Sequence, residues 1–274
     1  METRAELLRL ARVLSIDPRE LTFLEGADPG ELRELRGSIS DRLLARNREH
    51  FERLVALGRH LPGRVAAGFT EHALGAQLSG RAASLLTADE LVDFASRLPA
   101  DFVADVAAVM DLRSVGSLLD RIDAAKVVEV TRVLTERQDW VTMGAFGGRI
   151  GRDALIQVIG MLDGEALARV GFLLENRSRL DEIQGLLDDE KLRGLLVAAG
   201  ECDLIPETIF LVDALSDDSV VRVGRILGEL NQERQEAFAV MLLKDTSLLA
   251  AAQRLIDSCP PVRAAIDRAR SQAA

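Results

Sequence analysis

One apolar pattern recurs along the chain, and its spacing is the strongest constraint on the fold. The first copy places apolar residues at positions 91, 94 and 98, and further copies begin at 127, 155, 192 and 220. Successive steps are therefore 36, 28, 37 and 28 residues, which makes a double repeat of 64 to 65 residues. Self-similarity at fixed spacing is typical of stacked helical units, each unable to bury its apolar face alone. The sequence therefore predicts an all-α solenoid of short helices.

The composition agrees with a helical core. Aromatic residues make up only 4% of the 274 residues, with no tyrosine and one tryptophan, so leucine, valine, isoleucine and alanine must fill the interior. No segment shows the alternation of a half-buried strand. So few aromatic side chains also argue against a stacking platform for single-stranded nucleic acid.

The net charge of −10 is unevenly distributed. Residues 1–80 carry 12 basic and 12 acidic side chains, so the remaining 194 residues hold 22 of the 34 basic groups and 32 of the 44 acidic ones. An acidic array repels phosphate backbones, which disfavours nucleic-acid binding.

The two cysteines and the N-terminal sequence bear on the compartment. Cys202 and Cys259 lie 57 residues apart, and Met1 leads directly into an amphipathic segment with no signal-peptide pattern. No run approaches the ~20 apolar residues of a membrane span. We therefore expect a cytoplasmic protein without a membrane span, in which both thiols are reduced and serve as small core residues.

Local signals predict an N-terminal region, 1–80, that forms a helical cap with one long helix. An amphipathic helix is expected over 2–14, a second short turn over 21–24, and the long helix from Asp28-Pro29-Gly30 to about residue 60, where Pro62-Gly63 ends it. A further helix is expected over 65–78, closed by Ser79-Gly80, and a small one over 81–86.

The array itself is predicted to span 81–259 and the C-terminal capping helix 260–274. Thr87 and Glu90 have the spacing of a capping box. Acidic residues recur at predicted helix starts, where capping explains them better than paired catalytic carboxylates do. Gly200 is expected to end a helix in the left-handed conformation.

Three short phrases resemble a known family. They are Leu98-Pro99-Ala100-Asp101, Val109-Met110-Asp111 and Leu118-Leu119-Asp120-Arg121-Ile122. Across roughly 85–245 the chain resembles the N-terminal intracellular domain of magnesium transporters of the MgtE type and the related helical repeats of flagellar motor-switch proteins. The resemblance implies a right-handed superhelix that serves as a regulatory or protein-contact module. The CBS-like pair and the transmembrane segments of the transporter are missing here, so magnesium transport is not implied. The phrase at 141–148 also resembles one in a family of uncharacterised bacterial helical proteins.

The segment 140–152 is the least repeat-like part of the array. Four glycines fall within eight residues, at 144, 147, 148 and 151, although each costs about 0.5–1 kcal/mol in a helix interior. Two explanations stay open: close helix packing, or a ligand or partner site with arginines holding an anion at a helix start. The candidate contact residues are Trp140, Met143, Gly144, Phe146, Gly147, Gly148, Arg149 and Arg152.

Other candidate sites are weaker. The three histidines, His50, His60 and His72, have spacings that match no zinc motif, and no catalytic triad is readable, so no catalytic, metal or cofactor residue is predicted. The arginine-rich face of the long helix (Arg42, Arg46 and Arg53) is either a solvated mixed-charge surface or a docking site for an acidic partner.

The sequence thus predicts a non-catalytic helical-repeat scaffold that binds a protein, with a homodimer as an option. The alternative is a carrier or sensor for a small apolar ligand inside the superhelix, and an enzyme is the third hypothesis. An unbroken apolar inner face would favour the ligand, whereas a charged open groove would favour a protein partner.

Overall fold

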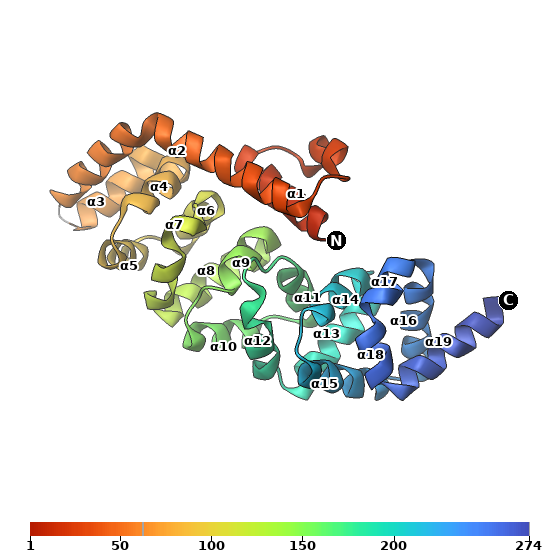
Figure 1. Ribbon diagram of the computed structural model, residues 1–274. Helices are drawn as coiled ribbons and strands as arrows, with labels where there is room; N and C mark the ends of the chain where they lie inside the picture. Colours follow the sequence, from red (N-terminus) through yellow and green to blue (C-terminus); the bar gives the residue numbers. More distant parts are fainter. Residues whose placement is uncertain (62, 274) are drawn as a thin grey trace. The chain divides into compact units, whose positions relative to one another are not determined.

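The computed structural model describes residues 1–61 and 63–273, and within these ranges every regular element is a helix (Figure 1). The all-α prediction is therefore confirmed for the described chain. Its residues form two compact units: Glu2–Val158, called the N-terminal unit here, and Ile159–Ala274 with Met1, called the C-terminal unit.

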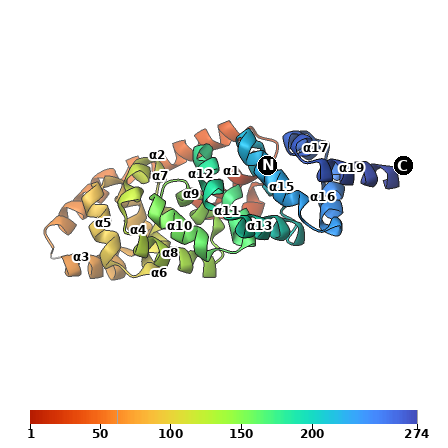
Figure 2. The same ribbon diagram turned by 90° about the horizontal axis from the view of Figure 1, so that it is seen from below.

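The N-terminal unit contains one long helix, α2, among shorter ones. Its helices are α1 (Glu2–Leu14), η1 (Pro18–Leu24), α2 (Pro29–Arg59), α3 (Gly63–Phe69), η2 (Thr70–Leu74), α4 (Gly75–Ala82), η3 (Ala83–Leu85), α5 (Ala88–Arg97), α6 (Ala100–Val109), α7 (Leu112–Val115), η4 (Gly116–Arg121), α8 (Ala124–Glu136), α9 (Trp140–Gly147) and the first turns of α10 (Arg152–Met161). Helix α1 packs on α2, α4 packs on α2 and α6, and α6 packs on α8, a succession that both views show (Figure 1 and Figure 2).

A buried carboxylate joins α1 to α2. Glu6 is 1% exposed, and its Oε1 accepts a hydrogen bond from Arg9 Nη1 at 2.6 Å. Arg33 and Arg36 of α2 each bring Nε to 3.3 Å from this carboxylate. Buried charges need such partners, and the apolar cluster of Leu7, Leu10 and Leu32 surrounds the same interface.

The C-terminal unit consists of short helices throughout. They are the end of α10, α11 (Gly164–Phe172), η5 (Arg177–Arg179), α12 (Leu180–Leu186), α13 (Asp189–Glu201), α14 (Ile205–Asp213), α15 (Asp217–Gly228), α16 (Gln232–Lys244), α17 (Thr246–Ala251), α18 (Gln253–Ser258) and α19 (Pro260–Ala273). Helix α11 packs on α13 and α14, α13 on α15, α15 on α18, and α16 on α19. These helices therefore pack on α-helices two or three positions further along the chain.

The predicted helix starts are confirmed where they depend on local caps. Asp28 accepts from the backbone N–H groups of Gly30 and Glu31, and Thr87 and Glu90 form both bonds of the capping box. Asp123, Asp163 and Asp188 cap their helices in the same way. These acidic residues thus have a structural use at helix N-termini. The 3-10 turn after α1 begins earlier than expected, at Pro18, because Asp17 caps it.

The prediction that Gly200 ends a helix in the left-handed conformation was wrong in its residue. Helix α13 continues to Glu201, and the left-handed residue is Asp203, with φ 56°. Beyond it the Leu204 N–H reaches the Ala199 carbonyl at 2.8 Å, which closes the helix end. An aspartate tolerates this conformation better than most residues.

The predicted break at Ser79-Gly80 was also wrong. The chain turns at Gly75 (φ 70°), after a five-residue π-helix, η2, and both Ser79 and Gly80 lie inside α4. Gly80 is there because α4 approaches α6 closely: a Cβ on it would lie 2.8 Å from the carbonyl oxygen of Val106. The predicted stop at Pro62 lies outside the described residues.

Among residues 1–61 and 63–273, no helix is both long enough and apolar enough to cross a membrane.

Candidate functional site

The glycine-rich segment 140–152 is largely helical and partly buried. Trp140 to Gly147 form α9, in which Met143 and Gly144 are buried and Trp140 is half-buried. Phe146 packs against the apolar cluster around Leu112 and Leu119. Of the other candidate residues, Gly147 and Arg149 are half-buried, Gly148 is buried, and Arg152, which begins α10, is exposed.

Close packing explains one glycine of this segment, Gly151, and one that faces it, Gly116. A Cβ on Gly151 would lie 2.9 Å from the carbonyl oxygen of Asp120. A Cβ on Gly116 would lie 2.8 Å from Nε of Arg149, whose Nη1 donates to the Ala145 carbonyl at 3.1 Å. The Arg149 side chain therefore lies along the backbone of its own unit and fills the space that Gly116 leaves.

A long-range contact holds the start of α9. Asp139 caps the helix by accepting from the N–H of Thr142 at 3.2 Å and from its hydroxyl at 2.8 Å, and it also pairs with Arg12 of α1. The two partners lie 127 residues apart. Sequence reasoning missed this pair because nothing local marks Arg12 as its partner.

The C-terminal unit contains a hollow of about 280 Å³ between α13, α14, α15 and α16, called the α13–α16 hollow here. Buried apolar side chains form its floor: Leu196, Ile205, Leu227 and Phe238. The exposed Ala237 of α16 opens onto it, and so do polar groups at the rim, among them Asn231 and Glu233. Glu201, Asn231, Glu233 and Arg234 make its rim polar, so the hollow has room for one apolar group on the floor and for polar contacts around it.

An ion pair crosses the rim of the hollow. Arg234 of α16 donates through Nη2 to Oε1 of Glu201 of α13 at 2.8 Å, and both side chains are about half exposed, at 45% and 61%. Water screens such a pair, so it opens at little cost. No local pattern in the sequence predicts this hollow, because Gly200 and Ala237, the two small residues that line it, lie 37 residues apart.

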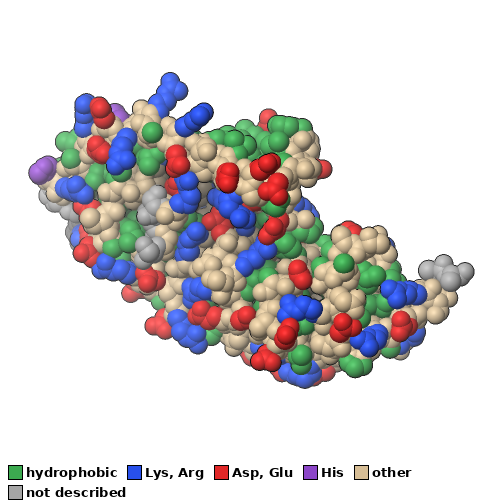
Figure 3. Space-filling model, in the orientation of Figure 1, with side chains coloured by type: hydrophobic (Ala, Val, Ile, Leu, Met, Phe, Trp, Pro, Cys, Tyr) green, Lys and Arg blue, Asp and Glu red, His purple; other side chains and the backbone are tan. Residues whose placement is uncertain are grey.

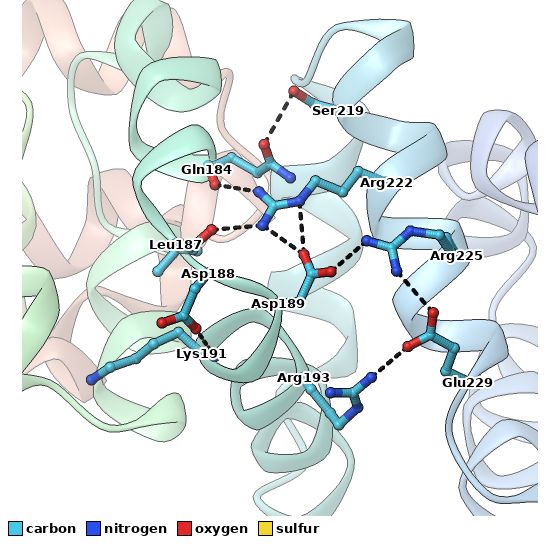
Figure 4. Close-up of polar contacts among 10 residues, drawn as sticks. All are labelled: Gln184, Leu187, Asp188, Asp189, Lys191, Arg193, Ser219, Arg222, Arg225 and Glu229. Atoms are coloured by element: carbon cyan, nitrogen blue, oxygen red, sulfur yellow. Dashed lines mark hydrogen bonds and ion pairs between the residues drawn. The ribbon is translucent and has the colours of Figure 1, made fainter.

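A polar network links α13 to α15 (Figure 4). Asp189 at the start of α13 accepts hydrogen bonds from Arg225 at 2.6 Å and from Arg222 at 2.8 Å, both on α15. These bonds, that of Arg225 first, hold the pKa of Asp189 below its ordinary value. Arg225 also donates to Glu229 at 2.8 Å, and Glu229 pairs with Arg193 of α13. The network therefore ties α13 to α15 just beside the hollow.

Arg222 further satisfies the end of α12. Its Nη1 donates to the Gln184 carbonyl at 2.9 Å and its Nη2 to the Leu187 carbonyl at 2.7 Å (Figure 4). The last carbonyls of a helix have no partner within the helix, so a guanidinium in this position stabilises the helix end.

The histidines and cysteines do not assemble a site. His50, His60 and His72 are exposed, and within the described residues no three His, Cys, Asp or Glu side chains gather as a metal site would require. Both cysteines are free thiols, Cys259 buried and Cys202 half-buried, and burial raises the pKa of each. A raised pKa means less thiolate and hence a less reactive sulfur.

Comparison with protein-family models, with curated proteins and with solved structures found no match.

Proposed function

We propose that this protein is a non-catalytic helical-repeat scaffold that binds a protein partner, and that its α13–α16 hollow receives an apolar side chain of that partner. The observation that carries the proposal is the hollow itself: a buried apolar floor, a rim ion pair that water screens, and an ion-pair network that joins two of the helices around it. An apolar recess between packed helices suits a side-chain anchor of the kind that dominates protein interfaces.

A recurring lysine contact supports the repeat architecture. Lys126 in the first turn of α8 donates to the Leu98 carbonyl at 3.2 Å, and Lys191 in the first turn of α13 donates to the Leu162 carbonyl at 2.6 Å. The two lysines are 65 residues apart and the two leucines 64, the same double repeat as the apolar pattern. Arg222 and Arg254 make related contacts, each reaching the carbonyls at the end of an earlier helix.

We further propose that these repeats form a right-handed superhelix with the architecture of the MgtE-type N-terminal domain. Two features favour it: the packing of helices in the C-terminal unit on α-helices two or three positions further along the chain, and α19, which buries Val262, Ala265 and Ile266 while its other face is polar. A terminal helix of this kind is typical of the cap of a repeat array. A cytoplasmic location remains part of the proposal.

The test is native mass spectrometry of the protein purified from its own host, for the wild type and two variants. Ala237→Trp fills the hollow, whereas Val221→Trp, the matched control, adds the same side chain at an exposed position of α15 that does not line it. We expect a bound protein mass with the wild type and with Val221→Trp, and its loss with Ala237→Trp. Unchanged retention by Ala237→Trp would overturn the assignment of the hollow.

A small apolar ligand is the second candidate for the same hollow, since its volume suits a small molecule or part of one. In that case the wild type would retain a low-mass adduct instead of a protein, and Ala237→Trp would lose it. This outcome would replace the scaffold function with a carrier or sensor function.

A further inference from the structure

Helix α2 carries a stripe of five exposed side chains, called the α2 stripe here: Leu35, Arg42, Arg46, Arg53 and Leu57. Their steps are 7, 4, 7 and 4 residues. On a helix of 3.6 residues per turn these steps keep all five on one side and extend the stripe over about 33 Å. The stripe therefore places three arginines between two leucines.

Both leucines are exposed to solvent. Leu35 is 44% exposed and Leu57 is 59% exposed. From residue 41 to the end of α2 only Phe51 is fully buried, and it faces away from the stripe because it lies two positions before Arg53. The unit thus covers the opposite side of α2 and leaves this side open.

The charge of the stripe is not balanced within the chain. Among the residues that the structure describes, no carboxylate pairs with Arg42 or Arg46. Arg53 meets only Glu49 on its own helix, at 3.7 Å, with side chains 79% and 88% exposed, and such a pair contributes little. Basic side chains project from the edge that α2 occupies (Figure 3).

Three other arginines of the unit differ in this respect. Arg59, Arg121 and Arg137 each pair with a carboxylate of another helix, at 2.6, 2.5 and 2.6 Å. These three arginines have a carboxylate partner on a second helix, whereas among the described residues no ion pair joins a stripe arginine to another helix.

Two anchors hold α2 on either side of the stripe's centre. Arg113 of α7 brings its Nη2 to 2.7 Å from Oδ1 of Asp41. Its Nη1 lies 2.9 Å from the position that a Cβ on Gly37 would occupy. At the other end Arg59 donates to Glu90 of α5 at 2.6 Å. These contacts add to the packing of α2 on α1 and α4. A helix that is already ordered in the free protein has a lower ordering cost on binding.

We propose that the α2 stripe docks an acidic amphipathic helix of another protein, with carboxylates opposite Arg42, Arg46 and Arg53 and an apolar side chain at each end. This surface lies in the N-terminal unit and is independent of the α13–α16 hollow, so either proposal stands if the other fails.

Charge decides the choice of occupant. In an antiparallel pair with a second copy, the register that brings Leu35 opposite Leu57 would also place Arg46 opposite Arg46, which is repulsive. A phosphate backbone or an anionic membrane would meet Asp41, Glu49 and Glu52 beside the arginines, with exposed fractions of 69%, 88% and 52%. A separate helix is able to place its carboxylates only where the arginines lie.

The test measures binding of a synthetic helical peptide of roughly 24 residues, as long as the stripe, with leucine at both ends and glutamates at the arginine spacing. A second peptide has glutamine for each glutamate. The full-length protein is tested as wild type, as Arg42→Gln/Arg46→Gln, and as a control, Arg48→Gln/Arg132→Gln, which removes the same charge from exposed positions off the stripe. Circular dichroism checks that all three are folded alike.

We expect the acidic peptide to bind the wild type and the control equally and the stripe variant about tenfold more weakly, as the loss of two exposed ion pairs implies. Added salt should weaken the binding. Equal binding of the glutamine peptide, equal binding by the stripe variant, or no binding of the acidic peptide would overturn the proposal. So would arginine-dependent binding of anionic vesicles or duplex DNA without peptide binding, or self-association that the stripe variant abolishes.

Discussion

Helix α2 and the helices around the α13–α16 hollow use apolar residues in opposite ways. Beyond residue 41, α2 fully buries one side chain and leaves a charged face open, whereas α15 alone fully buries Val220, Val223, Ile226 and Leu227. The charges differ too: residues 2–158 carry 21 basic and 24 acidic groups, and residues 159–274 carry 13 and 20. Among the described residues, α15 packs its apolar side against neighbouring helices, whereas α2 leaves one side exposed. The N-terminal unit therefore offers an exposed helix face, and the C-terminal unit offers a hollow between packed helices.

The largest effect is expected where two helix backbones of the C-terminal unit touch. A Cβ on Gly164 would lie 2.8 Å from the backbone nitrogen of Leu195 and closer still to the Gly194 carbonyl, and neither helix is able to move alone. We expect Gly164→Ala to lower the free energy of unfolding by about 3 kcal/mol, measured by urea denaturation. The control is Gly194→Ala, whose Cβ meets nothing within 4 Å, so it should be neutral or stabilising. Equal stability of the two variants would contradict the close packing.

The lysine contacts sharpen the comparison between the units. Lys191 donates to two carbonyls, Gly160 at 2.8 Å and Leu162 at 2.6 Å, whereas Lys126 donates to one, at 3.2 Å. Replacing each by methionine keeps the apolar stem and removes the donor. We expect a loss of about 1–2 kcal/mol for Lys191→Met and about half of that for Lys126→Met, again from urea midpoints. The reverse order would show that the two contacts are not equivalent parts of a repeat.

The anchor at the end of α2 predicts a pH dependence. The hydrogen bond from Arg59, followed by that from the Thr87 N–H, lowers the pKa of Glu90 from 4.5 to about 2. The folded state therefore binds this proton less readily than the unfolded state. The stabilisation is present in full above pH 4.5 and is lost as the pH falls towards 2. Glu90→Gln should flatten the stability profile of the N-terminal unit across this window, and an unchanged slope would show that Glu90 is not its source.

The smallest change in stability is expected at Gly37 of the N-terminal unit. As at Gly164, an added Cβ would lie less than 3.0 Å from a neighbouring atom. Here a Cβ would meet the end of a flexible side chain, Nη1 of Arg113, at 2.9 Å. Alanine also favours the helix by about 0.5–1 kcal/mol, which offsets the displacement of the guanidinium. We expect Gly37→Ala to change the free energy of unfolding by less than about 0.5 kcal/mol. A loss as large as that of Gly164→Ala would mean that α2 is packed as tightly as the C-terminal helices.

The sequence by itself determined the helical class and most helix starts. Caps act within three residues, so the local sequence around Asp28, Thr87 and Asp163 is enough to predict a helix start at each. The apolar period likewise marks the buried side of each helix, because side chains three and four apart share a face.

Only the tertiary structure decided which helices meet and what lies between them. Asp189 looked like another capping residue, yet it is the centre of an arginine network 33 to 36 residues away along the chain. The α13–α16 hollow and the closed start of α9 also depend on pairs of distant residues. Conversely, the mixed charges of α2 left both a solvated face and a docking face as interpretations, and only burial showed that one side carries three exposed arginines between two exposed leucines. Helix caps depend on neighbouring residues, whereas the exposure and long-range pairing of side chains depend on how the helices pack together.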